Sequence, residues 1–296
     1  MKEWCEYLIV TFFLYLFRIL PTSWVYLILS WLARLFFQLL KRRRELAIKN
    51  LSLAYGESEQ KAQYRQLAKK VFLGIARTTA ETILIFNGRY DIDQHVKNKE
   101  LAAEKIRQLA GRSTKGIIII GAHFGNWELL AHFMAIHGYP GLVVGRAGDN
   151  KLIENKMTTP FREKFGNRNV HTGKAMRDIT KTLRSGQPVG ILFDQKATRA
   201  NGVKSSFFGK QCGTTTAIAT LKLKYDPLIV PGFARRCDDG DYEILIGDPV
   251  TYTAEDKDDK KQKIAAMTQR YNDILEDMVR SAPEQWFWVH NRWRIG

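Results

Sequence analysis

Cysteine is scarce in this sequence of 296 residues, which contains only Cys5, Cys212 and Cys237. No C-x-x-C pair occurs, so the sequence predicts neither a zinc ribbon nor a dithiol redox motif, and so small and odd a number is typical of a reducing compartment. Walker, G-x-S-x-G, H-E-x-x-H and dinucleotide-binding patterns are also absent. We therefore expect that the protein uses no metal ion and no cofactor.

Acidic residues are few compared with basic ones. The chain has 30 Asp and Glu against 46 Lys and Arg, which gives a formal net charge of +16. This excess says little about the fold, but it indicates an anionic partner: nucleic acid, anionic lipid, or an acidic protein or substrate. Because no nucleic-acid-binding motif is present, we expect no nucleic acid partner. Hydrophobic residues make up 45% of the chain, which is enough for a substantial core.

The N-terminus lacks an uninterrupted apolar run of the about 20 residues that a clean transmembrane helix needs. Residues 7–20 and 24–40 are strongly apolar, but Arg18 and Arg34 interrupt them. Lys and Arg at 41–44 would hold the following chain on the cytoplasmic, anionic side of a membrane. Because both segments are nonetheless strongly apolar and are followed by basic residues, we expect them to form a membrane anchor.

The second apolar segment has a polar pattern of its own. Ser30, Arg34 and Gln38 recur every four residues, so on a helix they form one narrow polar stripe in a wide apolar surface. A helix of this kind suits the plane of the membrane interface or a groove in the protein. The pattern does not decide between an anchor that spans the membrane and one that lies on it. A buried helical hairpin of a soluble protein is the alternative.

The rest of the chain alternates short apolar runs with helical patterns. Residues 45–87 have the spacing of a helix, and residues 254–282 that of a final amphipathic helix. Runs of this kind are typical of strands buried on both faces, which predicts an α/β fold with a largely parallel central sheet flanked by helices. The runs are residues 116–121, 141–145, 188–193, 228–233 and 242–250. We expect an anchoring segment at residues 1–44 and one catalytic domain at residues 45–296.

Residues 117–130, IIIIGAHFGNWELL, carry the chemistry that we expect. A buried strand is followed by a turn with His123 and by a helix with Glu128 in its first turns. Open α/β sheets bind ligands at the carboxyl ends of their strands, so His123 lies where a site is expected. Glu128 could accept a hydrogen bond from one imidazole nitrogen and fix the tautomer, which would leave the other nitrogen free to deprotonate a hydroxyl. The spacing alone is also compatible with a structural histidine.

AHFGNWE resembles the H-x4-D/E box of the lysophospholipid acyltransferase-like superfamily. More narrowly, the chain resembles the bacterial lipid A biosynthesis lauroyl/myristoyl acyltransferase family. VVGR at 143–146, GILFDQK at 190–196 and APEQWFWVHNRWR at 282–294 follow in the order found in that family. The matching stretches cover most of residues 41–294. Ala122 is a departure from glycerolipid-acylating members, which often carry asparagine before the histidine.

The resemblance implies transfer of a fatty acyl chain from an acyl carrier protein to a hydroxyl of an anionic membrane glycolipid, a lipid A precursor. It places the enzyme at the cytoplasmic face of the bacterial inner membrane, with His123 as general base and Glu128 as its partner. A glycerolipid or mannolipid acceptor and a non-enzymatic, basic membrane-binding protein remain alternatives. The sequence does not determine the length of the acyl chain. It also does not decide whether the donor is an acyl carrier protein or coenzyme A.

Six further residues are candidates for substrate binding. Arg146 ends a predicted strand and could hold a phosphate or an oxyanion, and Arg168 could match an arginine of the family. Asp194 and Gln195 end another predicted strand and could contribute to the site or cap a turn. Phe207 and Phe208 could line an acyl channel or belong to the core.

Overall fold

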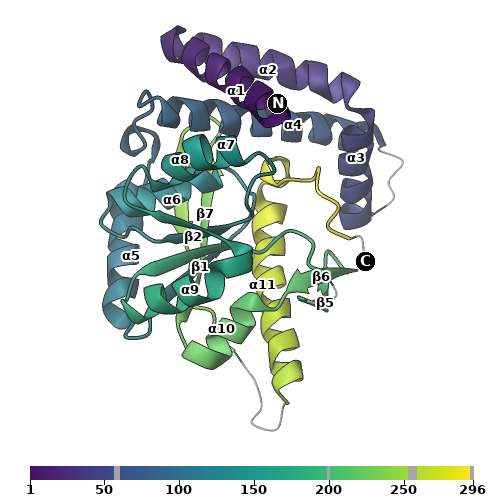
Figure 1. Ribbon diagram of the computed structural model, residues 1–296. Coiled ribbons are helices and arrows are strands. Elements are labelled where there is room, and N and C mark those ends of the chain that lie inside the picture. The colour runs from purple at the N-terminus through teal and green to yellow at the C-terminus, as the bar shows by residue number, and fades with distance from the viewer. Residues whose placement is uncertain (57–60, 199–200, 253–258, 294–296) are drawn as a thin grey trace.

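A computed structural model describes residues 1–56, 61–198, 201–252 and 259–293. At its centre is a six-stranded sheet of order β3-β2-β4-β1-β7-β8, parallel throughout except for the pair β7 and β8 (Figure 1). The strands are β1 (Ile117–Gly121), β2 (Leu142–Gly145), β3 (Arg168–His171), β4 (Pro188–Leu192), β7 (Leu228–Arg236) and β8 (Tyr242–Ile246). The predicted α/β fold with a largely parallel sheet flanked by helices is confirmed.

Both faces of the sheet are covered by helices. Ile118 and Ile120 pack in one cluster with residues of α9, α10 and α11, whereas Ile117 and Ile119 pack in another with residues of α5, α6 and α8. This division follows from the pleat, which turns successive side chains to opposite faces. The helices on the two faces are α5 (Lys99–Arg112), α6 (Trp127–Ile136), α8 (Thr159–Glu163), α9 (Ala175–Arg184), α10 (Ala217–Tyr225) and α11 (Lys260–Ser281).

Some elements differ from the expectation. Residues 45–87 do not form one helix: α3 (Lys41–Tyr55) ends at Gly56, whose φ is 95°, and α4 (Lys61–Phe86) is separate. The strand β3 and the hairpin β5 (Gly202–Phe207) and β6 (Lys210–Thr215) were not expected. Short helical turns also occur at η1 (Asp93–His95), α7 (Lys151–Ile153), η2 (Glu154–Thr158), η3 (Thr172–Lys174) and η4 (Pro283–Gln285). Residues 254–258 of the predicted final helix lie outside the described residues.

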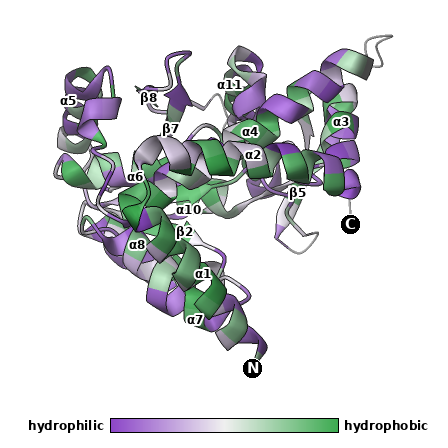
Figure 2. Ribbon diagram, turned by 90° about the horizontal axis from the view of Figure 1, so that it is seen from above, coloured by the Kyte–Doolittle hydropathy of each residue, from purple (hydrophilic) through white to green (hydrophobic). Residues whose placement is uncertain are grey.

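The apolar N-terminal segment forms two helices, α1 (Lys2–Ile19) and α2 (Thr22–Leu39). Seen from above, they diverge from their junction, so that α1 lies over α7 and α2 lies over α4 (Figure 2). Pro21 stands at the start of α2, where its missing N–H costs nothing. Arg89 donates hydrogen bonds to the carbonyls of Phe17, Arg18 and Leu20, so a cation satisfies the otherwise unpaired C-terminal end of α1.

The segment after α11 returns to the turn between β1 and α6. Phe287 N donates to the carbonyl of His123 at 3.0 Å, and Gly125 N donates to the carbonyl of Gln285 at 3.0 Å. Asn50 of α3 holds the same segment through the carbonyls of Trp288 and His290. The segment 285–290 therefore fixes the backbone of the turn that carries His123.

Gly125 is the residue of this turn with the least room for a side chain. Its φ is +57°, and an added Cβ would lie 1.8 Å from the carbonyl oxygen of Ala234. Its own carbonyl accepts a hydrogen bond from Thr78 of α4 at 2.9 Å. Only glycine allows β7, α4 and the turn to approach this closely.

We expect Gly125→Ala to lower the thermal melting temperature strongly, because β7 and the turn must separate to make room for the methyl group. Gly138→Ala is the matched control: its φ is +89°, but nothing lies within 4 Å of the added Cβ. The control should lose only the roughly 1–2 kcal/mol of left-handed strain. Equal melting temperatures of the two purified variants would contradict this account.

Candidate active site

His123 lies in the turn between β1 and α6, at the carboxyl edge of the sheet. Asn126 fixes the turn where it joins α6. Its side chain accepts a hydrogen bond from Leu129 N at 3.0 Å and so caps the helix. Asn126 in turn donates to the buried carboxylate of Glu81 at 2.9 Å. The imidazole keeps 22% of its surface exposed, so it can meet a ligand.

Asp194 is the carboxylate that pairs with His123. Its Oδ1 lies 2.8 Å from His123 Nδ1, and its Oδ2 accepts from the backbone N of His123 at 3.0 Å and from Trp286 Nε1 at 2.9 Å. The sequence-based expectation that Glu128 accepts from the imidazole is therefore wrong. The reason is the parallel pairing of β1 with β4, which aligns Gly121 with Leu192 and brings the two strand ends together.

The charges of this pair stabilise each other. Burial alone would lower the pKa of His123, but the Asp194 carboxylate beside it raises this pKa above its ordinary value. Burial would raise the pKa of Asp194, but the His123 ring and the donors around it hold this pKa below its ordinary value. Asp194 is therefore ionised at neutral pH and favours the imidazolium form whenever His123 takes up a proton.

The second ring nitrogen of His123 is accessible from the site. With Nδ1 donating to Asp194, neutral His123 carries its lone pair on Nε2. Gln195 Nε2 lies 3.4 Å from it. Trp127 packs edge-on against the ring with a centroid distance of 4.9 Å, which limits its orientation. This arrangement can accept a proton from a bound hydroxyl.

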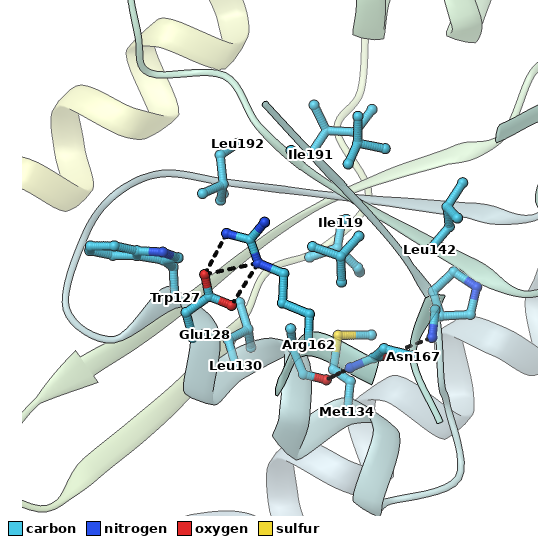
Figure 3. A pocket seen from close by; sticks show the side chains of 18 of the residues that line it. Ile119, Trp127, Glu128, Leu130, Met134, Leu142, Arg162, Asn167, Ile191 and Leu192 are labelled. Atoms are coloured by element: carbon cyan, nitrogen blue, oxygen red, sulfur yellow. Dashed lines mark hydrogen bonds and ion pairs between the residues drawn. The ribbon is translucent and has the colours of Figure 1, made fainter. Parts of the chain in front are cut away.

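Glu128 faces the same space, but its partner is Arg162 of α8. Arg162 Nη2 and Nε donate to Glu128 at 2.8 and 3.2 Å, and Figure 3 shows this side chain reaching across the pocket to the carboxylate. Burial would lower the pKa of Arg162, but the Glu128 carboxylate beside it raises this pKa above its ordinary value, so the guanidinium keeps its charge. The third nitrogen, Nη1, lies against Gly145, where an added Cβ would be 2.9 Å away.

A cavity of about 350 Å³ extends from His123 between α6 and the sheet. We call it the main cavity. Its opening carries His123, Glu128, Arg162 and Gln195. The deeper wall is almost wholly apolar, with Ile119, Leu130, Met134, Leu142, Ile191 and Leu192 (Figure 3). The cavity is therefore a largely apolar slot with a base and charged groups at its opening.

Of the other candidate residues, some line the main cavity and others do not. Asp194 and Gln195 belong to the site, and Arg146 lines the main cavity, although its side chain is 84% exposed and contacts Asp149. Arg168 starts β3, does not line the main cavity, and donates to Thr182. Of the two alternatives for Phe207 and Phe208, the structure favours the core over an acyl channel, because Trp286, Trp288 and Trp293 pack around them.

Two residues of the site were not expected from the sequence. Arg162 is one of many arginines, and nothing in its local pattern predicts that it meets Glu128. Trp286 belongs to a tail whose tryptophans are interleaved with His290, Arg292 and Arg294, a pattern that equally fits a core or a membrane surface. The only signal for Trp286 in the sequence is that an indole, once buried, needs a hydrogen-bond acceptor for its N–H.

Comparisons with known proteins agree with one another. The statistical model of the family described as "Bacterial lipid A biosynthesis acyltransferase" matches residues 1–295. The chain is 26% identical to the lipid A biosynthesis lauroyltransferase of Escherichia coli K12 over 93% of this chain and 87% of that one. It is 27% identical to a lipid A biosynthesis acyltransferase of Haemophilus influenzae, over 86% and 78% of the two chains. It is also 25% identical to the palmitoleoyltransferase of E. coli K12, over 86% and 80%.

Replacing Asp194 by Asn should lower the pKa of His123, because burial then acts without the opposing carboxylate charge. Diethyl pyrocarbonate modifies neutral imidazole, so the pH at which His123 becomes reactive, followed by peptide mass spectrometry, should move to lower pH. His137, which pairs with Asp93 at 3.0 Å, is the internal control and should keep its profile. An unchanged profile of His123 would show that Asp194 does not set its protonation.

Proposed function

The chain belongs to the bacterial lipid A biosynthesis acyltransferase family, and we propose that it moves a fatty acyl chain from an acyl carrier protein thioester to a hydroxyl of a lipid A precursor. The reaction would be a late, secondary acylation at the cytoplasmic face of the inner membrane. The observation that carries the proposal is the His123–Asp194 pair at the opening of an apolar slot. A hydrolase would need the same base, but the apolar walls of the slot beside His123 favour a lipid alcohol over water as the attacking group.

The mechanism needs only the residues described. His123 Nε2 takes the proton of the acceptor hydroxyl as its oxygen attacks the thioester carbonyl. The Gln195 side-chain amide, beside Nε2, is in a position to donate to the oxyanion of the tetrahedral intermediate. When the C–S bond breaks, the imidazolium returns its proton to the leaving thiolate, and an ester and a free thiol remain. The thioester supplies the activation, so we assign no cofactor.

Glu128 contributes at a distance from the reacting atoms. Its charge raises the pKa of His123, after the larger effects of burial and Asp194, and it holds Arg162 at the cavity wall. Arg162 Nη1, turned toward Gly145, and the exposed Arg146 offer positive charge at the opening. Both suit the phosphate groups of the acceptor or of the carrier protein's prosthetic arm.

The N-terminal helices are the proposed membrane anchor. Trp4, Phe12, Trp24, Leu27 and Trp31 each keep more than half of their surface exposed, which is costly in water and favourable in a bilayer. Residues 1–44 would form the anchor and residues 45–296 the catalytic domain, as expected from the sequence. The basic residues at 41–44 suit the anionic cytoplasmic surface. The net charge of +16 suits both an acidic carrier protein and a phosphorylated lipid.

His123→Ala should reduce transfer by about 10²–10⁴-fold, the usual contribution of a general base. Glu128→Ala should also abolish most transfer, because it leaves Arg162 buried without its partner. His95→Ala is the matched control, since His95 also pairs with an aspartate, Asp241 at 2.8 Å, but does not line the main cavity. The measurement is mass spectrometry of the product formed from purified protein, acyl carrier protein thioester and lipid A precursor. Full activity of His123→Ala would refute the mechanism.

Gly190→Leu should shift the product toward shorter acyl chains, because Gly190 lines the main cavity and its added side chain would fill part of the slot. The backbone tolerates the change, since the nearest atom to an added Cβ is the Leu142 carbonyl oxygen at 4.0 Å. The test offers a mixture of thioesters of different lengths and weighs the products. Gly111→Leu, in an open position on α5, should leave the distribution unchanged. An unchanged distribution in Gly190→Leu would mean that the chain does not enter this slot.

A further inference from the structure

A second apolar depression, of about 570 Å³, lies between α2, α4 and the segment 287–290. We call it the α2–α4 groove. Its walls include Leu32 and Phe36 of α2, Ile75 and Thr79 of α4, and Phe287 and His290. It shares none of its lining residues with the main cavity. The proposed reaction of the main cavity with one acyl chain leaves this groove without a role.

The groove opens on the apolar outer face of α2. Phe36 and Leu40 line the groove and are 45% and 47% exposed, and Trp31 and Leu39 continue the exposed apolar surface at 59% and 65%. Figure 2 shows α2 above α4, with green, hydrophobic turns that alternate with paler and purple ones. A hydrocarbon chain can therefore pass from the surface around α2 into the groove without crossing a polar region.

The packing of α2 against α4 bears on whether α2 crosses a membrane or lies along its surface. By length and apolar composition, α2 is the one helix of the described residues that could cross a bilayer. It packs along α4 at both ends, however: Val25 clusters with Ala80 and Leu84, and Phe37 contacts Phe72 with ring centroids 5.3 Å apart. Crossing would draw α4 into the hydrocarbon, where its charged residues are costly. The outer face of α2 therefore lies along one leaflet.

One side chain, that of Phe287, separates the groove from His123. Phe287 lines the groove, and the Phe287 ring lies 5.9 Å from the His123 ring, with Trp127 and the main cavity next to the same imidazole. The imidazole thus lies between two apolar spaces: it lines the main cavity, and the Phe287 ring stands between it and the groove. A transferase that joins two lipid-like substrates at one base needs two such spaces.

We propose that the α2–α4 groove seats a hydrocarbon chain of the acceptor lipid, which enters sideways from the leaflet that α2 contacts. This inference rests on the proposed function and adds the subsite for the second substrate. The donor arrives on a soluble carrier, whereas the acceptor already resides in the leaflet on which the groove opens. The exposed Arg43, at the edge of the groove beside Lys41 and Arg42, matches a phosphorylated headgroup.

Thr79→Trp tests the groove. Thr79 is exposed and bonds only within its helix, to the carbonyl of Ile75, so the protein should fold. An indole at this position would occupy the space of a few methylene groups. We expect the KM for the lipid A precursor in mixed micelles to rise about tenfold, because the chain forfeits part of its burial. The KM for the acyl carrier protein thioester and the slow hydrolysis of that thioester should stay unchanged.

Gln66→Trp is the matched control, since Gln66 is an exposed residue of the same helix that does not line the groove. Its KM values should equal those of the unmodified protein, and melting curves should be alike for all three proteins. If Thr79→Trp behaves like Gln66→Trp, or raises the KM for the donor instead, the groove does not seat the acceptor. If the unmodified protein transfers no acyl chain at all, the proposed function fails, which is a different result.

Discussion

Three segments that are far apart in the sequence meet at the carboxylate of Asp194. It lies two residues after β4, accepts hydrogen bonds from the backbone and the ring of His123 after β1, and accepts one from the indole of Trp286. A carboxylate that is only 2% exposed is stable in the core because these donors replace its water. The same hydrogen bonds fix the imidazole. The Asp194 carboxylate, whose charge the core must offset, therefore also orients His123.

Much of this arrangement follows from local sequence, but the pairing does not. The isoleucine run, the glycines around His123 and the helix after it predicted a strand, a turn and a site at its end. Glu128 is the nearest carboxylate in the sequence, so local spacing predicts it as the partner. The true partner lies 71 residues away, because the order of strands in a parallel sheet depends on crossovers that local patterns do not encode. Arg162 was missed for the same reason, since it reaches Glu128 from another helix.

Buried charges hold the periphery of the site as well as its centre. Glu81 of α4 accepts from Asn126, Arg77 and Tyr242, and so connects α4 to the cap of α6 and to β8. Arg292 is wholly buried, and within the part of the chain that the structure describes it pairs with no carboxylate but donates to the carbonyls of Gln195 and Gly213, to Thr214 and to Asn272. Such groups are costly to bury, and the hydrogen bonds that offset the cost also restrict the backbone beside Asp194.

The segment 285–292 has a consequence for the biogenesis of the protein. It is translated after every strand of the sheet, yet it supplies the donor to Asp194 and the contacts that fix the turn of His123. During synthesis, therefore, the imidazole of His123 has neither the turn contacts of Phe287 nor the indole donor that holds its Asp194 partner until this last segment has been added.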